Sequence, residues 1–152
     1  MLDLHTHILP GVDDGAKTLK DSVKLLEQMR DQGVSTAVAT VHFYPVIEVL
    51  EDFLSERTAA LKRLQKSIGK DYPIKILTGA EVFYFYGIGK FSGIKKLAIG
   101  ESKYLILELI GLKSIDDKVI NDIISINEEL KVTPIIAHVE RYCKYRGYKN
   151  LI

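Results

Sequence analysis

The sequence has very little cysteine, no excess of charge of either sign and no long apolar run. Its single cysteine, Cys143, cannot form a disulfide within the chain, which is typical of proteins from a reducing cytosol. Lysine and arginine number 21 against 20 aspartates and glutamates, so the net charge of +1 provides no basic field for nucleic acid or an anionic membrane. No apolar run approaches the ~18–20 residues of a membrane span, and the first residues lack the basic region of a signal peptide. We therefore expect a cytoplasmic protein without nucleic acid and without membrane insertion.

What the sequence does have is the length and composition of one folded domain. Its 152 residues are 47% hydrophobic and 27% charged, close to an ordinary soluble globular protein. Neither a flexible linker nor a repeat of fixed period divides the chain. We therefore expect a single domain over residues 1–152.

Short apolar segments alternate with amphipathic segments along the whole chain. The apolar and β-branched segments predict five strands, at residues 2–8, 34–40, 73–78, 103–107 and 133–137. Helices are predicted after Thr18 and after Ser114, each followed three residues later by an aspartate at capping-box spacing, and over about residues 47–68. Residues 83–99 show no clear period. This alternation predicts an α/β fold with a parallel sheet, either doubly wound or part of a (β/α) barrel.

All four histidines and two glutamates stand at the ends of these predicted strands. His5 and His7 are two residues apart in the first strand, so both side chains point to one face. The later strands are followed in order by His42, Glu81, Glu108 and His138. Solvated strand ends would explain either glutamate singly, but not why no histidine lies elsewhere. Because active sites of parallel α/β folds assemble at the carboxyl edge of the sheet, we predict a metal site there.

The ligand types indicate the metal and the chemistry. Imidazoles and carboxylates without a thiolate suit manganese, iron or zinc rather than a structural cysteine site. So many ligands predict more than one ion, bridged by carboxylates, and clustered ions lower the pKa of a bound water towards ~7. The predicted reaction class is metal-assisted hydrolysis.

Three further features each have two interpretations from the residues alone. Asp13 and Asp14 follow the first strand between two glycines, which suits a turn as well as a metal ligand. Arg141 has the geometry to hold a phosphate through paired hydrogen bonds, although an ordinary surface arginine is the simpler interpretation. The aromatic run at residues 83–86 could line the approach of an aromatic substrate, but core packing is favoured.

These residues, in this order, resemble a known family, the bacterial PHP-class (polymerase and histidinol phosphatase) protein-tyrosine phosphatases of capsule and exopolysaccharide operons, of the CpsB/YwqE type. The similarity is carried by DLHTHILPGVDDG at residues 3–15, ATVH at 39–42, GAE at 79–81, SKYLILE at 102–108 and TPIIAHVERY at 133–142. It runs in register along the whole chain. Two departures are Val41 where the family has proline before the histidine, and the family's final Asp-x-His pair, which lies beyond residue 152.

The resemblance implies a fold, a cofactor and a reaction. The fold would be a distorted (β/α) TIM-like barrel of the PHP type, with about five βα units present and incomplete at the C-terminus. The cofactor would be Mn²⁺ first, with iron or zinc as alternatives, and up to three ions. The reaction would be hydrolysis of phosphotyrosine on a bacterial tyrosine kinase, by metal-hydroxide attack on phosphorus, in the regulation of capsule or exopolysaccharide synthesis.

The resemblance also implies a role for each predicted site residue. The metal ligands would be seven residues: His5, His7, Asp14, His42, Glu81, Glu108 and His138. Glu81 would bridge the ion held by the first two histidines to a second ion, which Glu108 and His138 complete. Asp14 and His42 would hold a third ion, and Arg141 would bind the substrate phosphate.

Other classes of protein fit the residues less well. A cysteine-based tyrosine phosphatase requires an arginine six residues after its cysteine, whereas Lys149 stands six residues after Cys143. An amidohydrolase shares the first-strand His-x-His, but its later lysine or histidine bridging ligands have no counterpart. An inactive truncated metal-binding remnant of the family, or another PHP- or amidohydrolase-type phosphoesterase, stays open as the alternative, as does a homo-oligomer.

Overall fold

The structure, a computed structural model, describes residues 1–144 and 147–151. In these residues seven strands pair exclusively in parallel, as the alternating pattern predicts. The strands are β1 (Leu2–Thr6), β2 (Thr36–Ala39), β3 (His42–Phe43), β4 (Lys75–Thr78), β5 (Glu81–Phe83), β6 (Tyr104–Glu108) and β7 (Thr133–Ile136). The α-helices between them are α1 (Leu19–Asp31), α2 (Leu50–Ile68) and α3 (Asp117–Glu128). The parallel α/β class predicted from the sequence is therefore confirmed.

Two of the predicted strands are each followed by a second short strand, and this divides the sheet in two. One sheet has the order β1-β2-β4 and the other β3-β5-β6-β7. The backbone ladder continues across the break, because the Gly79 amide donates to the Ala39 carbonyl at 2.9 Å and the Glu81 amide donates to the Val41 carbonyl at 3.0 Å. Neighbouring strands therefore follow the order of the chain, which is the order of a (β/α) barrel rather than of a doubly wound sheet.

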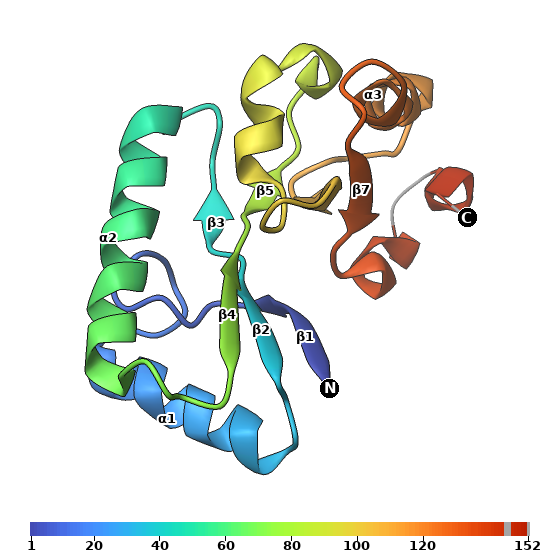
Figure 1. The fold of residues 1–152 in the computed structure, drawn as a ribbon. Coiled ribbons are helices and arrows are strands. Elements are labelled where there is room, and N and C mark those ends of the chain that lie inside the picture. The colour runs from blue at the N-terminus through green and yellow to red at the C-terminus, as the bar shows by residue number, and fades with distance from the viewer. Residues whose placement is uncertain (145–146, 152) are drawn as a thin grey trace.

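The described residues do not form a closed sheet. Within residues 1–144 and 147–151, β1 pairs with β2 alone and β7 pairs with β6 alone, so each leaves one edge unpaired. Figure 1 shows the strands as an open, curved wall, with α1 and α2 beside the first sheet and α3 beside β7. β2 and β4 end where the two sheets meet, and β3 and β5 begin there.

The helix boundaries agree with the cap signals except at α3. Thr18 forms a capping box with Asp21 before α1, as predicted: the Asp21 amide donates to the Thr18 hydroxyl and the Thr18 amide donates to the Asp21 carboxylate. The predicted cap at Ser114 is wrong. Asp116 caps α3 instead, because its carboxylate accepts from the Val119 amide at 3.0 Å. α2 begins at Leu50 rather than near residue 47.

The region that showed no period contains two 3-10 helices, η1 (Ile88–Lys90) and η2 (Ser92–Leu97). A helix with three residues per turn does not produce the 3.6-residue apolar pattern of an α-helix. Both helices nevertheless bury apolar side chains, including Ile88, Ile94 and Leu97.

The buried apolar side chains of the described residues form two separate clusters. The larger one lies between the sheets and the helices and includes Leu26, Leu64 and Val119. The smaller one centres on Val38 and Ile106, together with Ile99 and Ala137. Of the helices in the described ranges, none is long and apolar enough to cross a membrane.

Candidate metal centre

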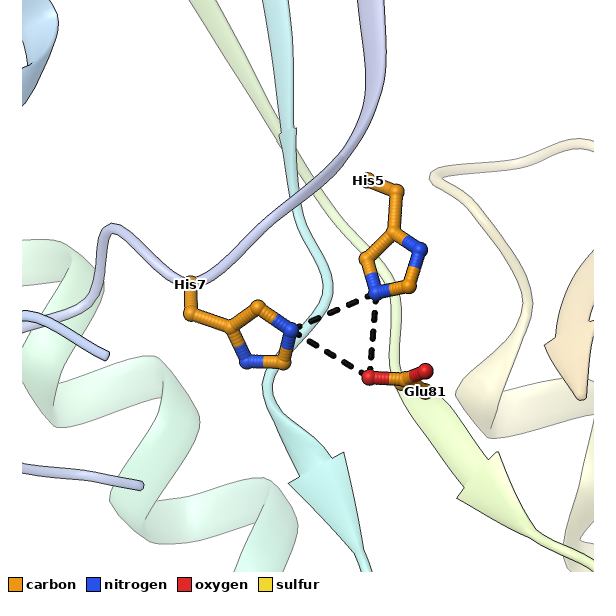
Figure 2. A group of neighbouring side chains, drawn as sticks. All are labelled: His5, His7 and Glu81. Atoms are coloured by element: carbon orange, nitrogen blue, oxygen red, sulfur yellow. Dashed lines mark hydrogen bonds and ion pairs between the residues drawn. The ribbon is translucent and has the colours of Figure 1, made fainter. Parts of the chain in front are cut away.

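Three of the predicted ligands meet where β1 ends and β5 begins. Figure 2 shows the rings of His5 and His7 turned towards the carboxylate of Glu81. The Nε2 atoms of His5 and His7 lie 3.0 Å and 3.2 Å from Glu81 Oε2, and 3.3 Å from each other. His5 belongs to β1, whose register shifts between Asp3 and Thr6. The two histidines of the His-x-His pair thus contact the same carboxylate.

Glu81 is the centre of a ring of imidazoles. His42 Nδ1 lies 3.2 Å from Glu81 Oε2, and His138 Nε2 lies 3.3 Å from Oε1. The strand pairing accounts for part of this arrangement, since His42 and Glu81 are direct partners in the β3–β5 ladder. The Glu81 side chain is 0% exposed. All four histidines of the chain thus converge on one fully buried carboxylate.

Four buried polar atoms of this cluster have no hydrogen-bond partner among the described residues. Neither oxygen of Glu81 accepts a hydrogen bond, and Glu108 Oε2 and His42 Nδ1 are likewise buried without a partner. Buried polar groups are almost always hydrogen-bonded, so a group of buried lone pairs that face one another is the arrangement expected around a cation. The donor set of nitrogen and carboxylate oxygen fits a divalent transition metal.

Three overlapping groups of ligand atoms have the compactness of a metal site. They are His5, His7 and Glu81; His7, Asp14 and His42; and His42, Glu81 and Glu108, with all ligand atoms of a group within 4.8 Å of one another. The resemblance implies that Glu108 and His138 complete one ion site, and in the structure the compact group that contains Glu108 consists of His42, Glu81 and Glu108. His138 joins the cluster through its contact with Glu81. Asp14 is the peripheral member, 80% exposed and 3.4 Å from His42 Nε2.

Burial and charge shift the pKa values in this cluster in opposite directions. Burial raises the pKa of Glu81, but the imidazoles of His5, His7 and His42 outweigh it and hold the pKa well below the usual range. Burial and the nearby charge of Glu81 raise the pKa of Glu108. Two buried carboxylates that repel each other in this way are stabilised by a cation placed between them.

Asp13, for which the sequence allowed two interpretations, contacts the cluster through His7. Its Oδ2 lies 2.6 Å from His7 Nδ1 and accepts from the His42 amide at 3.1 Å, while Oδ1 accepts from the Gly15 amide at 3.0 Å. Burial lowers the pKa of His7, yet its hydrogen bond with Asp13 and the negative charges of Asp13 and Glu81 raise it to about 10. Asp13 therefore orients His7 instead of facing the ligand cluster itself. The sequence signals only the turn; the contact with His7 depends on the folded loop.

Arg141 lies at the rim of the cluster, on the 3-10 helix η3 (Val139–Lys144). Its Nη1 is 3.6 Å from Glu108 Oε1, and its side chain is 55% exposed. The helix begins directly after His138, whose φ of 52° is rare for a residue other than glycine. The Leu109 amide donates to the buried Tyr142 hydroxyl at 2.9 Å, which fixes the helix against the end of β6.

The cluster opens into a pocket of about 470 Å³. Its walls are formed by His7, Asp14, Gly15, His42, Tyr44, Glu81, Phe83, Glu108, Ile110, His138 and Arg141. Of the aromatic run at residues 83–86, Phe83 alone lines this pocket. The favoured interpretation of core packing is confirmed for Tyr84 and Phe85, which pack against the main core.

The fold and the pocket together define the class of protein. It is a parallel α/β protein whose histidines and buried carboxylates cluster at the ends of β1, β6 and β7 and at the starts of β3 and β5. Imidazole and carboxylate are the donor set of catalytic metal sites. The family model for capsular polysaccharide synthesis, CpsB/CapC, matches residues 1–151. The chain therefore belongs to the CpsB/CapC family.

Curated relatives cover the chain from end to end. The tyrosine-protein phosphatase CpsB of Streptococcus agalactiae serotype III (strain NEM316) is 30% identical over 154 residues, covering 100% of this chain and 62% of that protein. The tyrosine-protein phosphatase YwqE of Bacillus subtilis (strain 168) is 30% identical over 157 residues, covering 100% of this chain and 59% of that protein. This chain thus spans about three fifths of the length of these relatives.

A solved structure has the same fold. It comes from the crystal structures of YwqE from Bacillus subtilis and CpsB from Streptococcus pneumoniae, described as unique metal-dependent tyrosine phosphatases. The TM-score is 0.71 at 27% sequence identity, covering 93% of this chain and 56% of that chain.

Proposed function

We propose that this chain carries the metal centre of a metal-dependent protein-tyrosine phosphatase that acts on a bacterial tyrosine kinase and regulates capsule or exopolysaccharide synthesis. One observation carries the proposal: four imidazoles converge on the buried Glu81 carboxylate, whose two oxygens accept no hydrogen bond from the described residues. A hydrogen-bonded structural cluster would not leave those atoms unsatisfied. The names of the relatives supply the substrate class.

The proposed ligands are the seven residues predicted from the sequence, and Mn²⁺ is the proposed ion, with iron or zinc as alternatives. His5, His7 and Glu81 would hold one ion. His7, Asp14 and His42 would hold a second ion, and His42, Glu81 and Glu108 a third, with His138 beside Glu81. When bound, such ions supply Lewis acidity that neutralises phosphate charge and makes water a competent nucleophile near neutral pH.

The protein's own residues would position the substrate. Arg141 is half-exposed at the pocket rim, and its planar guanidinium suits two phosphate oxygens at once. Its contact with Glu108 places it at the edge of the ligand cluster, where a phosphate bound to the ions would lie. In the reaction an oxygen from water bonds to phosphorus, the bond between phosphorus and the tyrosine oxygen breaks, and a proton ends on the released hydroxyl.

We also propose that the open parallel sheet is part of a PHP-type (β/α) TIM-like barrel, within one domain over residues 1–152. The strand order supports this, since neighbours in space follow the order of the chain. The proposed location is the cytoplasm. A homo-oligomer would cover the unpaired edges of β1 and β7, which otherwise offer free hydrogen-bonding groups.

Phosphotyrosine-peptide hydrolysis by this chain, measured with added Mn²⁺ and after chelation, tests the proposal. Bound metal should be quantified on the same samples. We expect phosphate release that requires the metal and falls at least tenfold in Arg141→Ala, with Lys144→Ala on the same 3-10 helix as the matched control. Stoichiometric metal without turnover would favour the alternative, an inactive metal-binding remnant. Turnover that survives chelation would overturn the metal mechanism.

A further inference from the structure

Two aromatic rings stand beside the ligand cluster without belonging to the core. Tyr44 follows β3 directly, and Phe83 is the last residue of β5. Their ring centroids are 4.2 Å apart. Each also contacts the imidazole of His42, at 5.6 Å for Tyr44 and 5.2 Å, edge to face, for Phe83. The two rings therefore form a continuous aromatic surface that ends at a proposed metal ligand.

The three aromatic residues that follow Phe83 in the sequence make their contacts outside the pocket. The Tyr84 hydroxyl donates to Asp122 at 2.7 Å, and Phe85 packs edge to face on Phe91. Tyr86 is exposed, with the Lys118 ammonium 4.1 Å from its ring centroid. Phe83 therefore differs from the three aromatic residues that follow it, because its ring lines the pocket.

The aromatic pair lies in the same pocket as the proposed phosphate site. Tyr44 and Phe83 share the pocket of about 470 Å³ with Glu108 and Arg141. Both aromatic side chains are half-buried, so part of each ring faces the pocket. A phosphate held at the ligand cluster and Arg141 would leave its ester substituent within this pocket. An aryl substituent would find an apolar, aromatic wall there, whereas a short alkyl substituent would leave it uncovered.

We propose that Tyr44 and Phe83 form the aryl-binding wall of the site and set its preference for phosphotyrosine over alkyl phosphate esters. The inference rests on the proposed phosphatase function and adds the residues that select the substrate. Aromatic rings attract one another in offset or edge-to-face contacts, in addition to the effect of burying their area. Together with that burial, the wall should favour an aryl ligand by about tenfold or more.

Binding of two non-hydrolysable ligands tests the wall directly. We would titrate the Mn²⁺-loaded chain with phenylphosphonate and with methylphosphonate and measure both affinities by calorimetry. The unaltered chain should bind phenylphosphonate about tenfold more tightly. Phe83→Ala and Tyr44→Ala should each reduce that preference several-fold while leaving methylphosphonate affinity nearly unchanged. Tyr86→Ala removes an exposed aromatic residue of the same segment and should leave the preference intact.

Phe83→Leu controls for loss of structure, because it keeps an apolar side chain of similar size at the end of β5. It should retain methylphosphonate binding and lose part of the phenyl preference. Equal affinity for the two ligands in the unaltered chain, or a preference that survives Phe83→Ala and Tyr44→Ala together, would overturn the wall and leave the phosphatase proposal standing. Absence of binding for both ligands would overturn the phosphate site and the wall with it.

Discussion

The carboxylate of Asp13 holds the ring of His7, with 2.6 Å between Oδ2 and Nδ1, so that the opposite nitrogen faces Glu81. The Asp13 side chain is itself almost completely buried, 4% exposed. This pairing of a carboxylate with a histidine that points at a ligand cluster fixes the tautomer and the orientation of the ring. Asp13 is thus a positioning residue: it holds the proposed ligand His7 and is not itself a proposed ligand.

Replacement of Asp13 should weaken metal binding without removing a ligand. We expect Asp13→Ala to lower Mn²⁺ affinity about 10–100-fold, because His7 would no longer be held in one tautomer. Calorimetric titration with Mn²⁺ measures the affinity, and the pH dependence of the nitrogen chemical shifts of the His7 ring in the metal-free chain shows whether Asp13 still raises the pKa of His7. Asp71→Asn, at an exposed position, serves as the control. Unchanged affinity and an unchanged ring spectrum in Asp13→Ala would contradict the role.

Glu81 and Asp14 should differ in how many ions depend on them. Glu81 belongs to two of the three ligand groups and Asp14 to one. The isosteric change Glu81→Gln should therefore abolish two of the bound ions, whereas Asp14→Asn should abolish one at most. Metal content after dialysis against a weak chelator, measured by mass spectrometry of the metals, gives the count. Equal losses in the two variants would show that the ligand groups do not form separate sites.

Several features of the site follow from local sequence, and others depend on contacts across the fold. The common face of His5 and His7 follows from strand periodicity, and the start of α1 follows from the capping box at Thr18. Parallel strands with ligands at their ends suffice to bring Glu81 and Glu108 together. The first two were predictable because each depends on residues within one strand or one turn, and the third because it follows from the parallel pairing of β5 with β6.

The remaining features require tertiary contacts that no local pattern encodes. The second short strand that begins at His42 pairs with β5, so its position depends on a segment about forty residues away. The hydrogen bond between His7 and Asp13 forms because the loop after β1 folds back on that strand. The left-handed backbone at His138 is likewise imposed by its surroundings, and Asp116 displaced Ser114 as a cap because its carboxylate reaches the Val119 amide.

The loop that carries Asp13 and Asp14 requires a glycine at position 15. A Cβ on Gly15 would lie 2.3 Å from both the Cβ and the carbonyl oxygen of His7. Gly15→Ala should therefore push the loop away from the end of β1, at a cost of about 1–3 kcal/mol in the free energy of unfolding, and lower Mn²⁺ affinity as well. Chemical denaturation and metal titration of the same variant measure the two effects.

Gly33→Ala separates the effect on metal binding from general destabilisation. Gly33 has a φ of 80°, and an added Cβ meets no atom within 4 Å. The substitution should cost about 1–2 kcal/mol in backbone strain and leave Mn²⁺ affinity unchanged. If both glycine variants lose metal affinity in proportion to their stability, close packing of Gly15 on His7 is not what organises the site.

The hydrogen bond between Tyr84 and Asp122 should stabilise the fold at neutral pH and lose this effect at alkaline pH. Burial raises the pKa of Tyr84, and the hydrogen bond from its hydroxyl to Asp122 at 2.7 Å raises it further, well above the usual range. Since the folded pKa exceeds the unfolded value of about 10, the stabilisation is fully present below about pH 10 and is lost as the pH rises above it. Compared with Tyr84→Phe, the unaltered chain should be about 1 kcal/mol more stable at pH 7–9.

The difference between the two chains should then shrink steadily above pH 10. Urea denaturation of both chains at intervals of half a pH unit measures it, and the phenolate absorbance of the native protein shows independently that one tyrosine ionises later than the others. Tyr86→Phe, at an exposed position in the same segment, should leave the free energy of unfolding almost unchanged at neutral pH. If the difference in the free energy of unfolding between Tyr84→Phe and the unaltered chain stays constant up to pH 11.5, ionisation of Tyr84 is not coupled to folding. The hydrogen bond to Asp122 would then stabilise the fold equally at every pH tested.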